Sequence, residues 1–255
     1  FRKGDAYFSA GDYGAAAVAY QQVANAGQDS EYYANSLYML AWSHFKQSDY
    51  DAAVNAYVAT LDALLIASYE VTDLARGDRD MAQDSLRVMA IIFDSRGGSK
   101  AIAPMLSNAE AGHYRPLAYD ALGSLYLEQE RFEDSAQAYA GFIADEPFSE
   151  QAPGFQEKLI AVYEAAGFPQ QVIAAKTEFV SAYAVDEAYW ESAGSGVRAL
   201  IRPRLAQYID ELARYHHSLA QQGHEAGEES VAHYLRAADY YAMYVDSFPR
   251  DDRVP

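Results

Sequence analysis

Apolar and aromatic residues recur along this chain of 255 residues at spacings of three and four, which place them on one face of an α-helix. Four segments share one pattern, the aromatic–small motif: an aromatic, a small residue, a second aromatic and a bulky residue. The four sets are Tyr13, Ala16, Tyr20 and Val23; Tyr50, Ala53, Tyr57 and Thr60; Phe132, Ser135, Tyr139 and Phe142; and Tyr234, Ala237, Tyr241 and Tyr244. The small residues permit close helix approach, so the pattern predicts that most of the tyrosines pack in a core.

A second helical stripe recurs upstream of these motifs, with steps of three, one and three. Its copies are Leu37, Leu40, Ala41 and His44; Leu86, Met89, Ala90 and Phe93; Tyr119, Leu122, Gly123 and Tyr126; Gln156, Leu159, Ile160 and Tyr163; and Ile209, Leu212, Ala213 and His216. Turn-forming pairs such as Gly11-Asp12 and Ser48-Asp49 lie between the two kinds of stripe. The sequence therefore predicts helical hairpins with short turns.

Several intervals between successive hairpins lie close to ~34 residues, the period of tetratricopeptide repeats. The residues that match this family in order and spacing are Leu122-Gly123, Tyr126, Phe132, Ser135, Tyr139 and Pro147, and in an earlier unit Leu40-Ala41, Tyr50, Ala53 and Tyr57. The chain resembles the tetratricopeptide repeat family. This resemblance implies an all-α, right-handed superhelical solenoid of about six antiparallel helix hairpins.

The predicted organisation is a repeat array over residues 1–185, a connector and a last hairpin. The units lie near residues 1–28, 31–70, 78–110, 114–147 and 152–185; the connector is 186–197, with a turn at Gly194-Ser195-Gly196, and the last hairpin is 198–255 with an inserted loop at 221–229. The units around Phe93 and Tyr163 depart from the pattern, because Pro169 replaces an aromatic in the latter. A turn is expected at Gly77-Asp78. Both ends interrupt a helical pattern, so we expect a piece of a longer chain that continues into a further repeat.

The charge balance restricts the classes of partner. The chain has 37 acidic residues against 19 Lys and Arg, a formal net charge of −18, which opposes binding to nucleic acid and favours basic partners. Cysteine is absent, which excludes disulfides, thiolate catalysis and Cys-ligated metals. No stretch approaches the ~20 apolar residues of a membrane span.

The family resemblance also implies where a partner binds, because the first helices of such hairpins line a groove. The residues expected to face it are Asn35, Tyr38, Trp42, Phe45 and Lys46, continued by Asp120, Ser124 and Glu128. Aromatic rings beside carboxylates suit a protein segment with aromatic, aliphatic or basic anchors. In the alternative interpretation, Trp42 and Phe45 pack against the neighbouring hairpin; the two interpretations are compatible.

Three other patterns have residue types found in metal sites, phosphate-binding loops or catalytic serine sites. Histidines 216, 217, 224 and 233, with glutamates 225, 228 and 229, match no standard metal spacing and fit a solvated loop better. Gly97-Gly98-Ser99-Lys100 lacks the strand and spacing of a phosphate loop and fits a turn between helices. Gly194-Ser195-Gly196 lacks the flanking pattern of a nucleophile elbow. We expect no catalytic site, metal or cofactor, and hence not an enzyme.

The tyrosine-rich units end in Glu146-Pro147-Phe148-Ser149 or Ser247-Phe248-Pro249 and resemble bacterial envelope repeat proteins. The resemblance implies a protein-binding scaffold, periplasmic or associated with the outer membrane, with the cytoplasm as the second choice. Two alternatives remain open: a scaffold associated with polysaccharide or peptidoglycan, which makes a glycan partner possible, and the helical superstructure of a larger enzyme.

Overall fold

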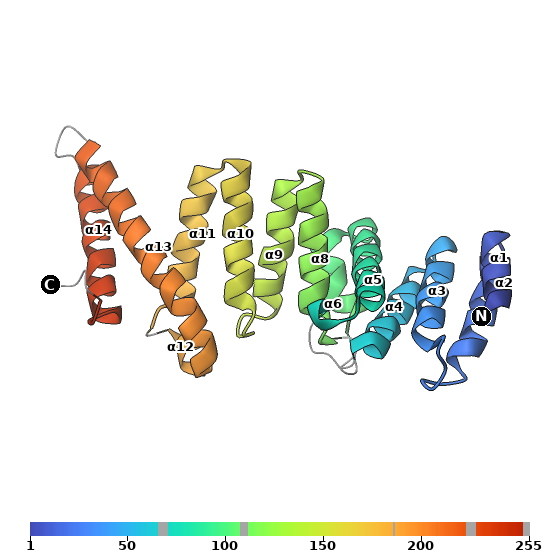
Figure 1. Ribbon diagram of the computed structural model, residues 1–255. Helices are drawn as coiled ribbons and strands as arrows, with labels where there is room; N and C mark the ends of the chain where they lie inside the picture. The colour runs from blue at the N-terminus through green and yellow to red at the C-terminus, as the bar shows by residue number, and fades with distance from the viewer. Residues whose placement is uncertain (66–70, 108–111, 186, 223–227, 252–255) are drawn as a thin grey trace. The chain divides into compact units, whose positions relative to one another are not determined.

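The computed structural model describes residues 1–65, 71–107, 112–185, 187–222 and 228–251, and this part of the chain is helical without a strand (Figure 1). Consecutive helices form antiparallel hairpins, so the predicted all-α fold of tetratricopeptide-like hairpins is confirmed. The chain divides into two compact units, residues 1–141 and 142–255. The division falls within one helix, and the predicted connector lies inside the second unit.

The first unit begins with two regular hairpins. Its helices are α1 (Arg2–Ser9), α2 (Tyr13–Ala24), α3 (Tyr33–Lys46), α4 (Tyr50–Leu65), the short η1 (Val71–Asp73), α5 (Arg76–Ser95), the short η2 (Gly98–Ala101), α6 (Ile102–Met105), α8 (Arg115–Glu128) and the start of α9 (Phe132–Asp145). Each hairpin stacks on the next, because α2 packs against α3 and α4 packs against α5.

The described part of the second unit contains the end of α9 and five further helices. These are α10 (Ala152–Ala166), α11 (Pro169–Tyr183), α12 (Ala188–Ser192), α13 (Ser195–Gln222) and α14 (Glu228–Ser247). The helices α10 and α11 form one hairpin, and α13 and α14 form the last one (Figure 1). Pro169 is the first residue of α11, where its fixed φ and missing N–H suit a helix start.

Small residues set the spacing between paired helices. Ala16, Ala53 and Ser135 are fully buried, and the second aromatic of each of their motifs is buried beside them. At Gly123 in α8, a Cβ atom would lie only 2.4 Å from the ring of Tyr139 in α9. The Ser135 hydroxyl donates a 2.8 Å hydrogen bond to the Gly123 carbonyl, which holds α8 and α9 at this short distance.

Tyrosine hydroxyls donate hydrogen bonds to aspartates, most of which lie on a different helix. The pairs are Tyr20 to Asp5 at 2.7 Å, Tyr38 to Asp84 at 2.7 Å, Tyr114 to Asp62 at 2.8 Å, Tyr126 to Asp94 at 2.9 Å and Tyr244 to Asp251 at 3.0 Å. Part of the acidic excess therefore has an internal role, because these carboxylates accept hydrogen bonds from half-buried or buried phenols.

The structure corrects the predicted turn at Gly77-Asp78, because α5 begins at Arg76 and includes both residues. An aspartate in the first turn favours a helix start, since it interacts well with the positive end of the helix dipole. The predicted turn at Gly194-Ser195-Gly196 is also wrong beyond Gly194, because α13 begins at Ser195. The inserted loop predicted at 221–229 lies mostly at residues 223–227, outside the described residues, and its two ends belong to α13 and α14.

The core prediction for the tyrosines fails in the last hairpin, where Tyr234 and Tyr241 of α14 are exposed by 47% and 40%. The corresponding second aromatics of the earlier motifs are buried. Both rings lie beside His217 of α13, with ring centroids 6.0 and 6.3 Å from it, at the edge of the contact between α13 and α14.

Candidate functional site

A groove of about 400 Å³ lies between α5 and α8 in the first unit. Residues of the two helices line it: Gln83, Leu86 and Arg87 from α5, and Leu117, Asp120, Ala121, Ser124, Leu125 and Glu128 from α8. Apolar side chains alternate with polar ones along this surface, which is the composition of a site for a partner side chain.

The groove exists because α8 packs directly on α5. The predicted unit at 78–110 has no long second helix in its described part: α5 is followed only by η2 and the one-turn α6. Gly97 and Gly98 make this change of direction with φ values of 111° and 74°, which only glycine adopts readily. Gly97 lies in a turn and Gly98–Ala101 form the short helix η2, so this segment connects two helices, as expected.

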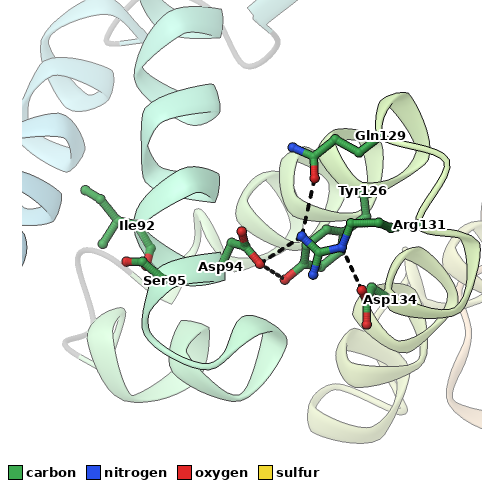
Figure 2. Close-up of polar contacts among 7 residues, drawn as sticks. All are labelled: Ile92, Asp94, Ser95, Tyr126, Gln129, Arg131 and Asp134. Atoms are coloured by element: carbon green, nitrogen blue, oxygen red, sulfur yellow. Dashed lines mark hydrogen bonds and ion pairs between the residues drawn. The ribbon is translucent and has the colours of Figure 1, made fainter.

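A polar cluster joins the end of α5 to α8 and the start of α9 (Figure 2). The Tyr126 hydroxyl donates to Asp94 Oδ1, and the Arg131 guanidinium donates to the same oxygen at 3.2 Å and to Asp134 at 2.7 Å. Arg131 also lies over the Tyr126 ring, 4.1 Å from its centroid. Burial and the bond to Asp94 raise the pKa of Tyr126 to about 12, so the phenol stays a donor at neutral pH.

A second cluster fixes Arg87 at the groove. Asp84 of α5 accepts the Tyr38 hydroxyl on one oxygen at 2.7 Å, and the Arg87 guanidinium on the other at 3.1 and 2.6 Å. Burial and the hydrogen bond from Tyr38 to Asp84 raise the pKa of Tyr38 to about 12. The arrangement holds α3 beside α5 and pairs the positive charge of Arg87 with Asp84.

Three of the residues predicted to bind a partner meet in this groove. Asp120, Ser124 and Glu128 line its α8 wall, with Ser124 and Glu128 exposed to solvent. Tyr38 contacts the opposite helix through Asp84, next to Arg87. These positions are compatible with the predicted binding role, which itself stays a prediction.

The remaining predicted residues lie elsewhere on α3. Trp42 is half-buried and meets Phe45 edge to face, with ring centroids 5.5 Å apart, and the Lys46 ammonium lies 5.5 Å from the Trp42 centroid. Phe45 also contacts Tyr50, the first residue of the paired helix α4. Asn35 is exposed in the first turn of α3. None of these four lines the groove between α5 and α8.

The charges of the groove favour a cationic ligand group. The carboxylates of Asp120 and Glu128 line the groove, and the charge of Arg87 is paired with Asp84. Glu128 makes no ion pair within the described residues. An aliphatic chain can pack along Leu86, Leu117 and Leu125 while its charged end meets the carboxylates, which is how Lys and Arg side chains bind such surfaces.

The sequence reasoning missed Gln83, Asp84 and Arg87 on α5. The sequence contains a pattern that could have predicted them: Asp84 and Arg87 lie three residues apart, so they share one face of the helix, and this face differs from that of the core stripe at Leu86. The unit around Phe93 departs from the repeat pattern, and its polar face was therefore not assigned to the groove.

The histidines considered as metal ligands are only partly described. His216 is buried between α13 and α14, and its Nδ1 lies 3.0 Å from Nδ1 of His233, while His217 lies beside Tyr234. His224 and Glu225 lie outside the described residues. The described chain brings together no group of three or more His, Asp or Glu side chains suited to a metal ion.

The fold and the groove define an all-α protein of stacked helical hairpins. Residues 35–61, which cover most of α3 and α4, match the tetratricopeptide repeat family. Repeats of this family generally mediate protein–protein interaction and are typically found in non-enzymatic scaffolds. A search of curated proteins gave no match. Among the described residues, no helix is long and apolar enough to cross a membrane.

Proposed function

We propose that this chain is a non-enzymatic scaffold that binds a segment of a partner protein in the groove between α5 and α8. The observation that carries the proposal is the concentration of Asp120, Ser124 and Glu128 on one wall of that groove, opposite an arginine that is already paired. A partner segment with a Lys or Arg next to aliphatic residues fits both features.

The groove is suited to specificity because its walls are held in place before a partner arrives. Tyr126 and Arg131 tie the end of α5 to α8, and Tyr38 ties α3 to α5. Pre-organised walls lower the entropic cost of binding, so a short segment can bind with useful affinity. The cluster of Trp42, Phe45 and Lys46 provides a second contact area on α3 for an aromatic anchor.

We further propose that the scaffold works in a bacterial cell-envelope assembly, in the periplasm or at the outer membrane. The support is the resemblance of the tyrosine-rich units, with their Glu-Pro-Phe-Ser and Ser-Phe-Pro endings, to envelope repeat proteins. Fractionation of the source cells tests this location: release of the protein with the periplasmic contents, or recovery with outer membranes, is expected. Recovery with the cytoplasmic fraction would contradict it.

A random-peptide display selection on the immobilised protein tests the groove. The wild type should enrich peptides with Lys or Arg beside Leu, Ile or Val, and the double variant Asp120→Lys, Glu128→Lys should not. The control is Glu133→Lys, Glu178→Lys, which makes the same change of charge at exposed positions of α9 and α11. Equal enrichment by both double variants would show that general charge, rather than the groove, selects the peptides.

A further inference from the structure

A cavity of about 530 Å³ lies within the second unit, between α11, α13 and α14. Its apolar wall consists of Ile173 and Val180 of α11 and Met243 of α14. Polar side chains of α13 and α14 line the opposite part. Ligand pockets have volumes of roughly 300–1,000 Å³ and combine apolar walls with a few polar groups, so this cavity has the size and lining of a small-molecule site.

Two side chains of opposite charge face this cavity from α14. Arg236 and Asp239 both line it, and their spacing of three residues places them on the same side of the helix. Within the described residues neither side chain makes a hydrogen bond or an ion pair, and they are not paired with each other. A ligand with a single charge would therefore meet one like charge here, whereas a zwitterion can satisfy both groups.

His216 of α13 adds a buried polar group to the same lining. Its ring is 7% exposed and lies parallel to the Tyr240 ring, with centroids 5.9 Å apart. Its Nδ1 contacts Nδ1 of His233 at 3.0 Å, but its Nε2 makes no hydrogen bond within the described residues. Burial lowers the pKa of His216, so the ring is neutral at pH 7 and the two charges of α14 stay balanced. The imidazole thus has one nitrogen left for a hydrogen bond to a ligand.

We propose that this cavity binds a free α-amino acid with an aliphatic or thioether side chain. The ligand carboxylate pairs with Arg236, whose guanidinium can hold it by two parallel hydrogen bonds, and the ligand ammonium pairs with Asp239. The ligand side chain packs against Ile173, Val180 and Met243. An α-amino acid fits because it carries both charges on one carbon atom, and the Cβ atoms of residues one helical turn apart are only ~5–6 Å apart.

This site lies in the second unit, and the proposal does not depend on the groove between α5 and α8. Isothermal titration with L-leucine and three related compounds tests it. N-acetyl-leucine lacks the ammonium, leucinamide lacks the carboxylate, and glycine lacks the side chain. The wild type is expected to bind leucine at least about tenfold more tightly than each of the three. L-methionine, which has a thioether side chain, should bind like leucine.

Two variants identify the groups that hold the ligand. Arg236→Gln should weaken leucine binding at least about tenfold, and Asp239→Asn should remove the preference for leucine over N-acetyl-leucine. The matched controls are Arg250→Gln and Asp246→Asn, which change exposed residues outside the cavity lining and should bind leucine like the wild type. Circular dichroism verifies that all four variants keep their helices.

Three results would overturn the proposal. If the wild type binds neither leucine nor methionine at millimolar concentrations, the cavity is not an amino-acid site. Equal binding of leucine and N-acetyl-leucine by the wild type would assign the cavity to simple carboxylates instead. Equal losses in the cavity variants and in their controls would show that the net charge, rather than the cavity, determines binding.

Discussion

The Tyr126 hydroxyl in α8 donates a 2.9 Å hydrogen bond to the Asp94 carboxylate near the end of α5, and Arg131 donates to the same carboxylate oxygen (Figure 2). These residues are 32 positions apart in the sequence, about one repeat. The bond joins α5 to α8, the two helices that line the groove. A single phenol–carboxylate pair therefore helps to hold together the two helices on which the proposed binding site lies.

Removing this hydroxyl should cost stability. Tyr126→Phe is expected to lower the free energy of unfolding of the first unit by about 1 kcal/mol, because a part-buried hydrogen bond is lost while Asp94 keeps its contact with Arg131. Urea unfolding followed by Trp42 fluorescence measures this, in a Trp190→Phe background so that the signal reports the first unit alone.

Tyr57 gives the matched comparison. It is fully buried, but its hydroxyl has no hydrogen-bond partner in the described part of the chain. Tyr57→Phe should therefore leave the unfolding free energy unchanged or raise it, since an unsatisfied buried hydroxyl is removed. Equal losses at Tyr57 and Tyr126 would show that ring packing, and not the hydrogen bond to Asp94, determines the effect.

The short distance between α8 and α9 makes Gly123 sensitive to size. A Cβ at Gly123 meets the Tyr139 ring at 2.4 Å, so Gly123→Ala is expected to destabilise by about 1–3 kcal/mol through overpacking. Gly154 in α10 is the control, because nothing lies within 4 Å of its added Cβ. Gly154→Ala should be neutral or stabilising by up to about 1 kcal/mol, the helix preference of alanine. Thermal unfolding of both variants measures the contrast; a harmless Gly123→Ala would contradict the packing account.

The last hairpin should lose stability in mild acid. Burial, followed by the neighbouring His233 and Arg236, lowers the pKa of His216 below its ordinary value of 6.5. The unfolded chain therefore binds this proton more readily than the folded chain, and stability falls as the pH drops through 6.5.

Unfolding followed by Trp190 fluorescence at about pH 7.5 and about pH 5.5 measures this loss, in a Trp42→Phe background. His216→Gln should make the pH dependence smaller, whereas His217→Gln on the same helix should leave it unchanged. If the two variants respond alike, other groups carry the acid sensitivity.

Much of the fold can be predicted from the sequence, because residues close together in the chain determine where each helix lies and which face of it is buried. Steps of three and four identified the buried faces of α2, α4 and α9, and their small residues, Ala16, Ala53 and Ser135, are buried as expected. The turn residues Gly11 and Asp12 were equally informative: Gly11 has a φ of 80°, and the Asp12 side chain accepts the Ala15 amide at the start of α2.

The groove depends on contacts between residues far apart in the chain, and local patterns do not report these contacts. Asp84 meets Tyr38 across 46 residues, and α5 meets α8 where the described part of the intervening segment contains only η2 and the one-turn α6. Likewise, the motif at Tyr241 has the same spacing as at Tyr57, yet Tyr57 is fully buried and Tyr241 is 40% exposed.

The central claim, that the groove between α5 and α8 recognises a basic segment of a partner, is tested most directly by a charge swap. Isothermal titration gives the Kd of two peptides for two proteins. One peptide is selected by the wild type, and the other is the same peptide with its Lys or Arg changed to Glu. Each is titrated into the wild type and into the double variant Asp120→Lys, Glu128→Lys. The selected peptide should bind the variant at least about tenfold more weakly, and the changed peptide should regain affinity for the variant. Equal affinity of the selected peptide for both proteins would contradict the claim.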